Sequence, residues 1–242
     1  MKKFCCLFFL SVSIFSCKKE EKTTTDASNG NKIGAGTTDI QGVKYKTVVI
    51  GEQEWMAENL KVTKFNDGTT IPNLIENNQW ESTENAAWCD YNHDPSNSET
   101  YGKLYNWFTV DRNTNGNKNV CPSGWHVPSG KEWKVLSSYL GGSSVAGGKM
   151  MEKGTSHWAA PNSKADNSSL FTALPAGRRE STYGGWGEPF YGLGTSCNWW
   201  STTKDSDIPG ESGFKYLQSN NNYLYNAGIN ENNGYSIRCL KD

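Results

Sequence analysis

The chain has 242 residues and an almost balanced charge, with 24 Lys and Arg against 25 Asp and Glu and a formal net charge of -1. This balance argues against nucleic acid as a partner, because a nucleic-acid-binding domain carries a basic patch or stripe. The 25 glycines and 25 asparagines, together with 10 tryptophans and 11 tyrosines, exclude a coiled coil, a helical bundle and a multi-span membrane protein. We therefore expect a turn-rich domain whose core depends on aromatic rings.

The first residues resemble the signal of an exported lipoprotein. Two lysines precede an apolar run at residues 4–15, which is too short to cross a bilayer as a mature helix. The run ends in Ile14-Phe15-Ser16-Cys17, which is similar to the bacterial lipobox. We predict a signal peptide at residues 1–16 and lipidation of Cys17. An ordinary signal peptide with a chance cysteine, or a retained anchor helix, is the alternative.

The next segment, residues 17–38, is predicted to be the lipidated Cys17 followed by a flexible tether, because it has too few apolar side chains to fold. Its Lys18-Lys19-Glu20-Glu21 stretch resembles the surface-export signal of Bacteroidetes lipoproteins. We therefore expect an outer-membrane protein, lipid-anchored and surface-exposed, that contacts the membrane through its lipid. The folded domain is expected at residues 39–242.

The predicted elements begin with a strand at residues 43–49, where apolar and polar side chains alternate. A turn and a second strand at residues 54–60 complete a hairpin. Leu104, Trp107 and Phe108 have the spacing of a short helix that packs on the core.

The clearest helix begins after Ser129, which can form a capping box with Glu132, and ends at Gly141-Gly142. Beyond residue 143 we expect short strands broken by Gly, Asn and Pro, and a terminal strand at residues 235–240. Early strands, one or two short helices and a loop-rich remainder predict an α+β fold.

Four cysteines lie in the predicted exported domain, namely Cys89, Cys121, Cys197 and Cys239. An even number in an oxidising compartment predicts disulfides, and the sequence leaves three pairings open. The chain has no CxxC pair and its three histidines are scattered, so a zinc site is not expected.

Calcium is the one cofactor that the sequence suggests. Asp90, Asn92 and Asp94 place oxygen ligands at alternate positions. Residues 111–117 also match the opening of an EF-hand loop, but Pro122 stands at the twelfth position, where a bidentate Glu is required. Asx turns are the alternative for both segments, since Asp and Asn at this spacing often bond to their own backbone.

The best signal for a binding site lies in a glycine-rich stretch. Tyr183, Trp186, Phe190 and Tyr191 follow Arg178 there. Rings presented from such loops can stack on sugars, and neighbouring polar groups suit sugar hydroxyls. The alternative is that these rings belong to the core of a domain with few strands.

Motifs for catalysis are not recognisable. The chain lacks the GxSxG, HExxH and P-loop spacings. Glu180 and Glu188 could flank a glycosidic bond, but the sequence does not place them at the separation that this chemistry requires. We therefore expect no catalytic residues.

A series of motifs resembles a known family. In chain order they are Val43-Lys44-Tyr45, Trp55-Met56-Ala57-Glu58-Asn59-Leu60, Trp88-Cys89-Asp90-Tyr91-Asn92, Tyr101-Gly102-Lys103-Leu104-Tyr105-Asn106-Trp107, Cys121-Pro122-Ser123-Gly124-Trp125-His126-Val127-Pro128-Ser129, Phe171-Thr172-Ala173-Leu174-Pro175-Ala176-Gly177-Arg178, Trp199-Trp200-Ser201-Thr202-Thr203 and Gly234-Tyr235-Ser236-Ile237-Arg238-Cys239-Leu240. They identify the chain as similar to the Fibrobacter succinogenes major paralogous domain, and distantly to formylglycine-generating, sulfatase-modifying enzymes.

The resemblance implies a C-type-lectin-like α+β fold, loop-rich with short strands, in which the terminal strand lies beside the first helix. It therefore implies a bridge from Cys121 to Cys239, which leaves Cys89 to pair with Cys197. The chain departs from the family at Cys197 and at an apparent inserted loop, residues 111–119.

Signal, lipid anchor, tether and lectin-like scaffold together favour a non-enzymatic cell-surface lipoprotein. We expect it to be a binding or adhesion module for extracellular polysaccharide or a surface protein. The alternative is a secreted enzyme on a sulfatase-modifying-like scaffold, either glycan-active or oxidative.

Overall fold

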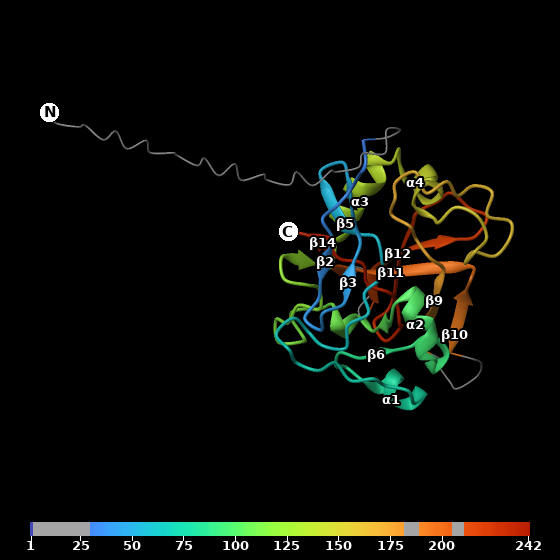
Figure 1. Ribbon diagram of the computed structural model, residues 1–242. Coiled ribbons are helices and arrows are strands. Elements are labelled where there is room, and N and C mark those ends of the chain that lie inside the picture. Colours follow the sequence, from blue (N-terminus) through green and yellow to red (C-terminus); the bar gives the residue numbers. More distant parts are fainter. Residues whose placement is uncertain (2–29, 182–188, 205–210) are drawn as a thin grey trace.

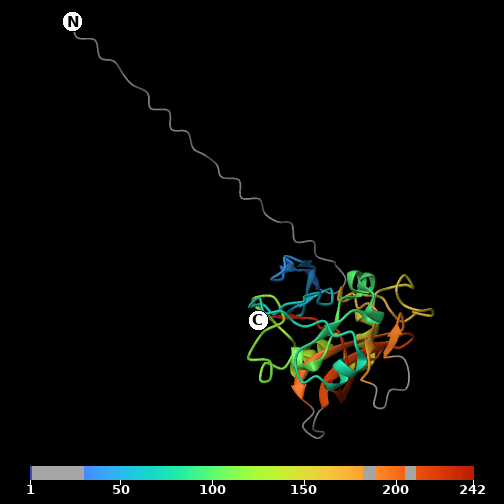
Figure 2. The ribbon, with the colours of Figure 1, turned by 90° about the horizontal axis from the view of Figure 1, so that it is seen from below.

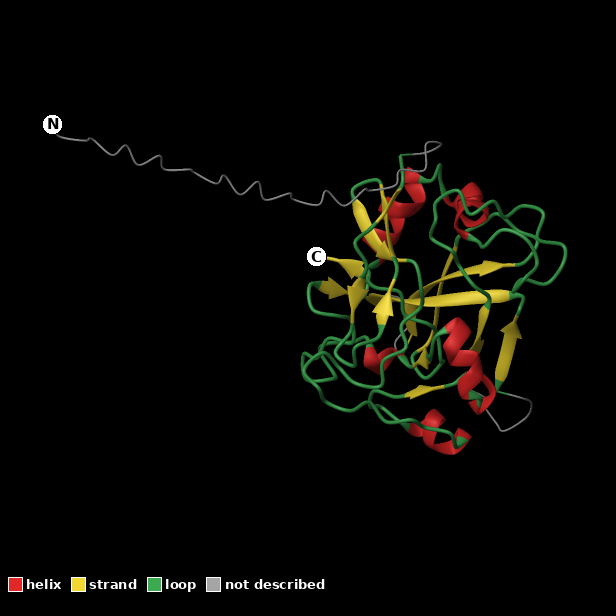
Figure 3. Ribbon diagram, in the orientation of Figure 1, coloured by secondary structure: helices red, strands yellow, loops and turns green. Residues whose placement is uncertain are grey.

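The computed structural model describes Met1 and residues 30–181, 189–204 and 211–242. It is an α+β structure with two five-stranded sheets, and its helices lie at the periphery with the strands between them (Figure 1; Figure 3). In spatial order the first sheet contains β1 (Lys32–Ile33), β4 (Thr47–Ile50), β5 (Gln53–Met56), β14 (Leu240–Lys241) and β8 (Trp125–His126). The second contains β10 (Phe190–Leu193), β9 (Ala176–Arg179), β11 (Ser196–Lys204), β12 (Glu211–Gln218) and β13 (Tyr225–Asn230).

Shorter elements complete the described residues. Two small ladders pair β2 (Thr37–Thr38) with β3 (Lys44–Tyr45), and β6 (Trp88–Cys89) with β7 (Leu104–Tyr105). The helices are α1 (Asn77–Ser82), α2 (Pro95–Tyr101), α3 (Gly130–Tyr139) and α4 (Ser143–Met150), and the 3₁₀ turns are η1 (Tyr91–His93) and η2 (Trp107–Thr109). Within the described ranges no helix combines the length and the apolar character that a membrane crossing requires.

The predicted amino-terminal hairpin is confirmed, because β4 and β5 pair antiparallel with Val48 opposite Trp55. The predicted tether over residues 17–38 extends too far, since β1 pairs with β4 and β2 pairs with β3. These residues join the fold through backbone hydrogen bonds rather than through burial of apolar side chains. The low apolar content of the segment therefore gave no signal of these strands. Figure 2 shows the blue amino-terminal strands at one side of the domain and the orange strands on the other, while the red carboxyl-terminal end lies near the blue strands.

Two further expectations need correction. Leu104 lies in strand β7, and only Trp107 and Phe108 of the predicted helix adopt a helical turn, in η2. The strands beyond residue 143 are not all short, because β11 has nine residues and β12 has eight. In each case long-range pairing decides the structure, which the local pattern does not reveal.

The carboxyl-terminal segment passes between the two sheets. Tyr235 forms a bridge to Tyr105, and Ser236 forms a bridge to Trp199 of the second sheet. Leu240 then pairs with Trp55 and His126 of the first sheet. The predicted strand at 235–240 is therefore mostly irregular, and every residue from 233 to 240 is buried.

Aromatic rings fill the core, as the composition predicted. Trp55, Trp133 and Trp199 are fully buried and pack on Phe171, with ring centroids 4.7–6.1 Å apart. Burying a ring of this size contributes a large hydrophobic stabilisation, and offset or edge contacts between rings add to it. These rings lie between α3 and the two sheets, so they hold the helix against both.

The structure contains the Cys121–Cys239 disulfide that the family resemblance implied, with the Cα atoms 6.0 Å apart. The expected Cys89–Cys197 bridge is wrong, because both cysteines are free and buried. Cys89 lies in the small ladder β6–β7, whereas Cys197 pairs opposite Gly177 in the second sheet. Burial raises the pKa of the Cys89 thiol to about 11 and also raises that of Cys197.

The disulfide closes a loop of 118 residues. In the chain-entropy model this closure stabilises the fold by about 4–5 kcal/mol. We therefore predict that dithiothreitol lowers the free energy of unfolding in urea by a comparable amount. Alkylation of the unreduced, denatured protein should label Cys89 and Cys197 and leave Cys121 and Cys239 unlabelled. Labelling of Cys121 would contradict the pairing.

Helix α3 begins with the predicted capping box. Ser129 Oγ accepts a hydrogen bond from the Glu132 amide at 3.4 Å, and Glu132 Oε2 accepts one from the Ser129 amide at 2.7 Å. Glu132 Oε1 also lies 2.9 Å from His126 Nε2, and His126 Nδ1 lies 2.6 Å from Asp242 Oδ1. His126 therefore has the structural role of joining β8, α3 and the segment after β14.

This cluster should make stability depend on pH. Burial opposes the charge on His126, but the two carboxylates prevail and raise its pKa above the usual 6.5, so its contribution is lost as pH rises through the raised value. Burial also opposes the charge on Glu132, but hydrogen bonds from Ser129 and His126 lower its pKa below 4.5, so its contribution is lost as pH falls through the lowered value.

We therefore predict that the cluster stabilises the fold most between pH 4.5 and 6.5. The thermal midpoint should decline above pH 6.5 as His126 loses its charge. The variant His126→Gln should make this decline nearly flat, and Asp242→Asn should make the decline smaller. Thermal unfolding across pH 4–9 measures both effects. An unchanged slope in His126→Gln would contradict the assignment.

Candidate functional site

The structure separates the residues that the sequence grouped as a binding site. Tyr183 and Trp186 lie outside the described residues. Phe190 and Tyr191 are consecutive in β10, so their side chains point to opposite faces of the strand. Phe190 is 9% exposed and Tyr191 is 38% exposed. Phe190 is therefore largely a core ring, which corrects the expectation that it stands free in a loop.

The face with Tyr191 also carries Arg178, which is its partner in the β9–β10 ladder. The guanidinium carbon of Arg178 lies 5.7 Å from the Tyr191 ring centroid, and Arg178 Nη2 lies 2.5 Å from Glu180 Oε1. This arrangement leaves the ring partly open to solvent. We call this surface the Tyr191 face.

The opposite side of β10 borders a depression of about 450 Å³. Its apolar wall consists of Ile75, Pro189 and Phe190, and its polar wall includes Asn77 and His93. Ile75 is 49% exposed, so part of this apolar wall is accessible to a ligand. We call this depression the Phe190 pocket, and sequence reasoning did not identify it as a site.

The walls of the Phe190 pocket are fixed by Arg179, which is 1% exposed. Its guanidinium donates hydrogen bonds of 2.8–3.0 Å to the carbonyls of Leu74 and Ile75 and to Asn77 Oδ1. The same group lies 4.4 Å from the Trp80 ring centroid and 5.4 Å from that of Phe190. Because these contacts do not involve a ligand, the pocket is formed in advance of binding.

His93 gives the pocket an imidazole. Its ring contacts Phe190 edge-on, with centroids 5.0 Å apart. Desolvation by burial and the nearby Arg179 charge lower the pKa of His93, so the ring is neutral at pH 7. Its Nδ1 is buried without a hydrogen-bond partner among the described residues. Asn92 and His93 both adopt positive φ, 53° and 57°, which sets the position of the ring.

Of the expected calcium ligands Asp90, Asn92 and Asp94, the two aspartates have other partners in the structure, and Asn92 lines the Phe190 pocket. Asp90 Oδ1 lies 2.8 Å from Lys103 Nζ and accepts a hydrogen bond from Ser98 Oγ. Asp94 Oδ1 accepts from the Ser96 amide at 2.9 Å and so caps α2. Among the residues that the structure describes, no three His, Cys, Asp or Glu side chains are grouped to hold a metal ion.

The segment at residues 111–117 also follows the Asx-turn alternative. Asp111 Oδ1 accepts hydrogen bonds of 3.0 Å from both the backbone amide and the side-chain amide of Asn113. Asn115 similarly accepts from the Lys118 amide at 2.9 Å. The polar side chains therefore hold the loop itself.

The pair Asp90–Lys103 offers a direct test, because both side chains are largely buried, at 7% and 13% exposure. Replacing Lys103→Met should destabilise the fold by about 3–5 kcal/mol, since it leaves a buried carboxylate without its counter-charge. The double variant Asp90→Asn/Lys103→Met should recover most of that loss. Urea unfolding of the two variants and the wild type measures the coupling, and additive losses would contradict it.

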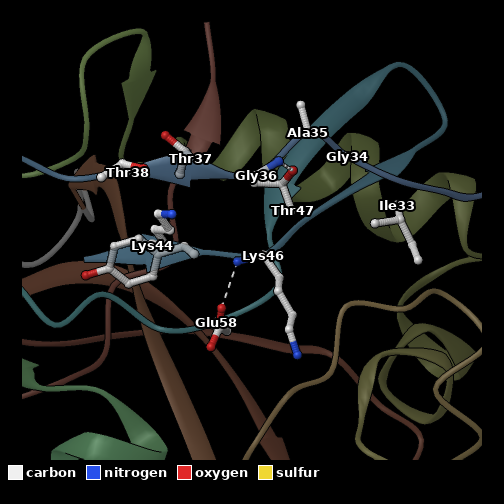
Figure 4. A pocket seen from close by; sticks show the side chains of 11 residues that line it. Ile33, Gly34, Ala35, Gly36, Thr37, Thr38, Lys44, Lys46, Thr47 and Glu58 are labelled. Atoms are coloured by element: carbon white, nitrogen blue, oxygen red, sulfur yellow. Dashed lines mark hydrogen bonds between the residues drawn. The ribbon is translucent and has the colours of Figure 1, made fainter. Parts of the chain in front are cut away.

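A second depression, of about 590 Å³, lies between the amino-terminal strands and the segment after β5 (Figure 4). Backbone and threonine groups dominate its lining, together with Lys44 and Lys46. Figure 4 shows Glu58 below β3, where its carboxylate accepts a hydrogen bond of 2.7 Å from the Lys46 amide. Part of this lining belongs to the segment expected to be tether, so the sequence analysis did not include it.

The fold and its pockets define a mixed α+β domain with preformed concave surfaces and a single interior disulfide among the described residues. Comparison with family models shows that residues 48–241 match the Fibrobacter succinogenes major domain. The chain belongs to this family. No curated protein and no solved structure matches the chain significantly.

Proposed function

We propose that this protein is a non-enzymatic binding module that holds an extracellular glycan in the Phe190 pocket. The observation that carries the proposal is a preformed concavity in which apolar walls meet amide, carboxylate and imidazole groups. Sugars require this mixture, because their C–H faces pack on apolar side chains while their hydroxyls need paired donors and acceptors. A surface protein that presents a polar loop is the second ligand class for the same pocket.

The cellular setting of the proposal comes from the sequence. We infer that the signal peptide predicted at residues 1–16, the predicted lipidation of Cys17 and the tether predicted over residues 17–38, shortened where β1 and β2 begin, serve to hold the domain at the outer surface of the outer membrane. The small charge imbalance suits an uncharged glycan, since no strong field would steer a charged ligand. The lectin-like scaffold of the resemblance agrees with this role.

Among the described residues, the acids and the imidazole that the sequence offered for catalysis have structural partners. Glu188 lies outside the described residues, and Glu180 pairs with Arg178. His126, the imidazole of the most specific family motif, is held between Glu132 and Asp242. A catalytic acid or base needs a free position toward a substrate, and these groups have structural partners.

A glycan array with the full-length protein in mild detergent tests the proposal. We predict weak binding, with a Kd of roughly mM to µM, because a shallow pocket makes few contacts and these must offset ordering costs. Replacing Ile75→Ala or His93→Ala should reduce the affinity at least about fivefold, equivalent to about 1 kcal/mol. Cleavage of a glycan would instead support the enzyme alternative.

The matched control is Val135→Ala, which shortens a side chain of similar exposure, 54%, on α3 outside the pocket. This variant should bind like the wild type. Tyr191→Ala separates the two faces of β10. If Tyr191→Ala abolishes binding while Ile75→Ala has no effect, the site lies on the Tyr191 face and the proposed pocket is wrong.

A further inference from the structure

A smaller and more enclosed cavity, of about 220 Å³, is lined by residues from the β3–β4 connection, the segment after β5, the end of α2 and the carboxyl-terminal segment. The residues that matter for its chemistry are Lys46, Glu58, Tyr101, Glu152 and Arg238. They come from segments as far apart as β3–β4 and the carboxyl-terminal segment, so only the folded chain assembles the cavity. The cavity shares no lining residue with the Phe190 pocket.

Arg238 supplies a buried cation to this cavity. It is 1% exposed, and none of the ion pairs of the described residues includes it. Its Nε and Nη2 donate to Asn59 Oδ1 at 3.2 and 3.0 Å, Nη2 also donates to the Thr172 carbonyl at 3.4 Å, and Nη1 donates to the Phe171 carbonyl. These four bonds leave one of the five guanidinium N–H groups without a partner in the part of the chain that the structure describes.

The direct hydrogen-bond partners of Arg238 are neutral acceptors, and its guanidinium carbon lies 4.2 Å from the Phe171 ring centroid. The nearby Glu58 carboxylate favours its charge through space but forms no ion pair with it. Desolvation lowers the pKa of Arg238 to about 9, which expresses how unfavourable the buried charge is. Burial of a cation is costly unless an anion accompanies it. A ligand carboxylate that reaches the remaining N–H would supply that anion.

Two carboxylates line the same cavity. Glu58 accepts the Lys46 amide at Oε2, and Oε1 has no hydrogen-bond partner among the described residues. Glu152 lies 2.8–2.9 Å from His157 Nδ1, and the His157 ring contacts Tyr101 edge-on. These acids repel a simple anion but attract an ammonium group. With Arg238 and the exposed Lys46 as cations, the cavity lining has two positive and two negative side chains.

We propose that this cavity binds a small α-amino acid, with its carboxylate on Arg238 and its ammonium group between Glu58 and Glu152. The volume agrees with this ligand class, because 220 Å³ corresponds to about seven water molecules at roughly 30 Å³ each and so to a ligand of similar atom count. Lys46 and Glu58 also line the larger depression of Figure 4, which gives the ligand a route from solvent. The proposal does not depend on glycan binding at the Phe190 pocket.

The test is calorimetry and thermal unfolding of the full-length protein in mild detergent with glycine, alanine and serine. Acetate and methylamine at the same concentrations carry only one of the two charges. We expect at least one amino acid to raise the thermal midpoint by about 3–5 °C at ten times its Kd. Acetate and methylamine should each bind at least tenfold more weakly.

Variants at the mouth avoid disturbing Arg238, which also holds the core. Glu58→Gln and Glu152→Gln should each weaken binding about tenfold, because each removes a charge-assisted hydrogen bond. Glu99→Gln is the matched control, since Glu99 lies on α2 beside the cavity residues Thr100 and Tyr101 but does not line the cavity. It should bind like the wild type.

Three results would overturn the proposal. The first is an absence of heat and of thermal shift with all three amino acids. The second is acetate binding as tightly as the amino acids, which would define a simple anion site. The third is wild-type affinity in both Glu58→Gln and Glu152→Gln.

Discussion

The fold depends on one buried polar network, in which the side chain of Asn59 joins segments from across the chain. Its Oδ1 accepts hydrogen bonds from Arg238 and from Trp199 Nε1, while its Nδ2 donates to the Tyr101 carbonyl and to Ser236 Oγ. Because every polar atom of this amide is paired in a water-poor interior, loss of any one partner would leave buried donors or acceptors unpaired. The network therefore specifies how the hairpin, the second sheet and the carboxyl-terminal segment meet.

The carboxyl-terminal segment connects the same parts of the fold through its backbone and through the disulfide. It bridges both sheets, contributes β14 to the first and is tied to the loop before β8 by the disulfide. The pockets lie where loops leave this frame, so their walls are set by backbone and guanidinium contacts rather than by a ligand. Arg179 does this for the Phe190 pocket and Arg238 for the 220 Å³ cavity, so a buried arginine stands at each of these two concave surfaces.

Local signals in the sequence predicted local structure well. The Ser129–Glu132 capping box, the β4–β5 hairpin and the aromatic core follow from short-range spacing and composition. The order of strands in the second sheet does not, because a contact such as that of Cys197 with Gly177 depends on long-range pairing. The alternation of Phe190 and Tyr191 on one strand was a signal that the two rings face opposite ways. Arg238, a charge inside the apolar run of residues 237–240, was a signal of a buried cation.

The single disulfide has a consequence for how the chain matures. If the chain is exported from its amino end, Cys89 and Cys121 reach the oxidising compartment before the other cysteines of the domain. Cys239, the partner of Cys121, is the last to arrive. Thiols that meet early can oxidise with each other, so vectorial export favours a non-native bridge. Burial in the finished fold protects Cys89 and Cys197, but that protection begins only when the carboxyl-terminal segment is in place. A protein with this arrangement depends on a disulfide isomerase, or on oxidation slow enough to wait for the last cysteine.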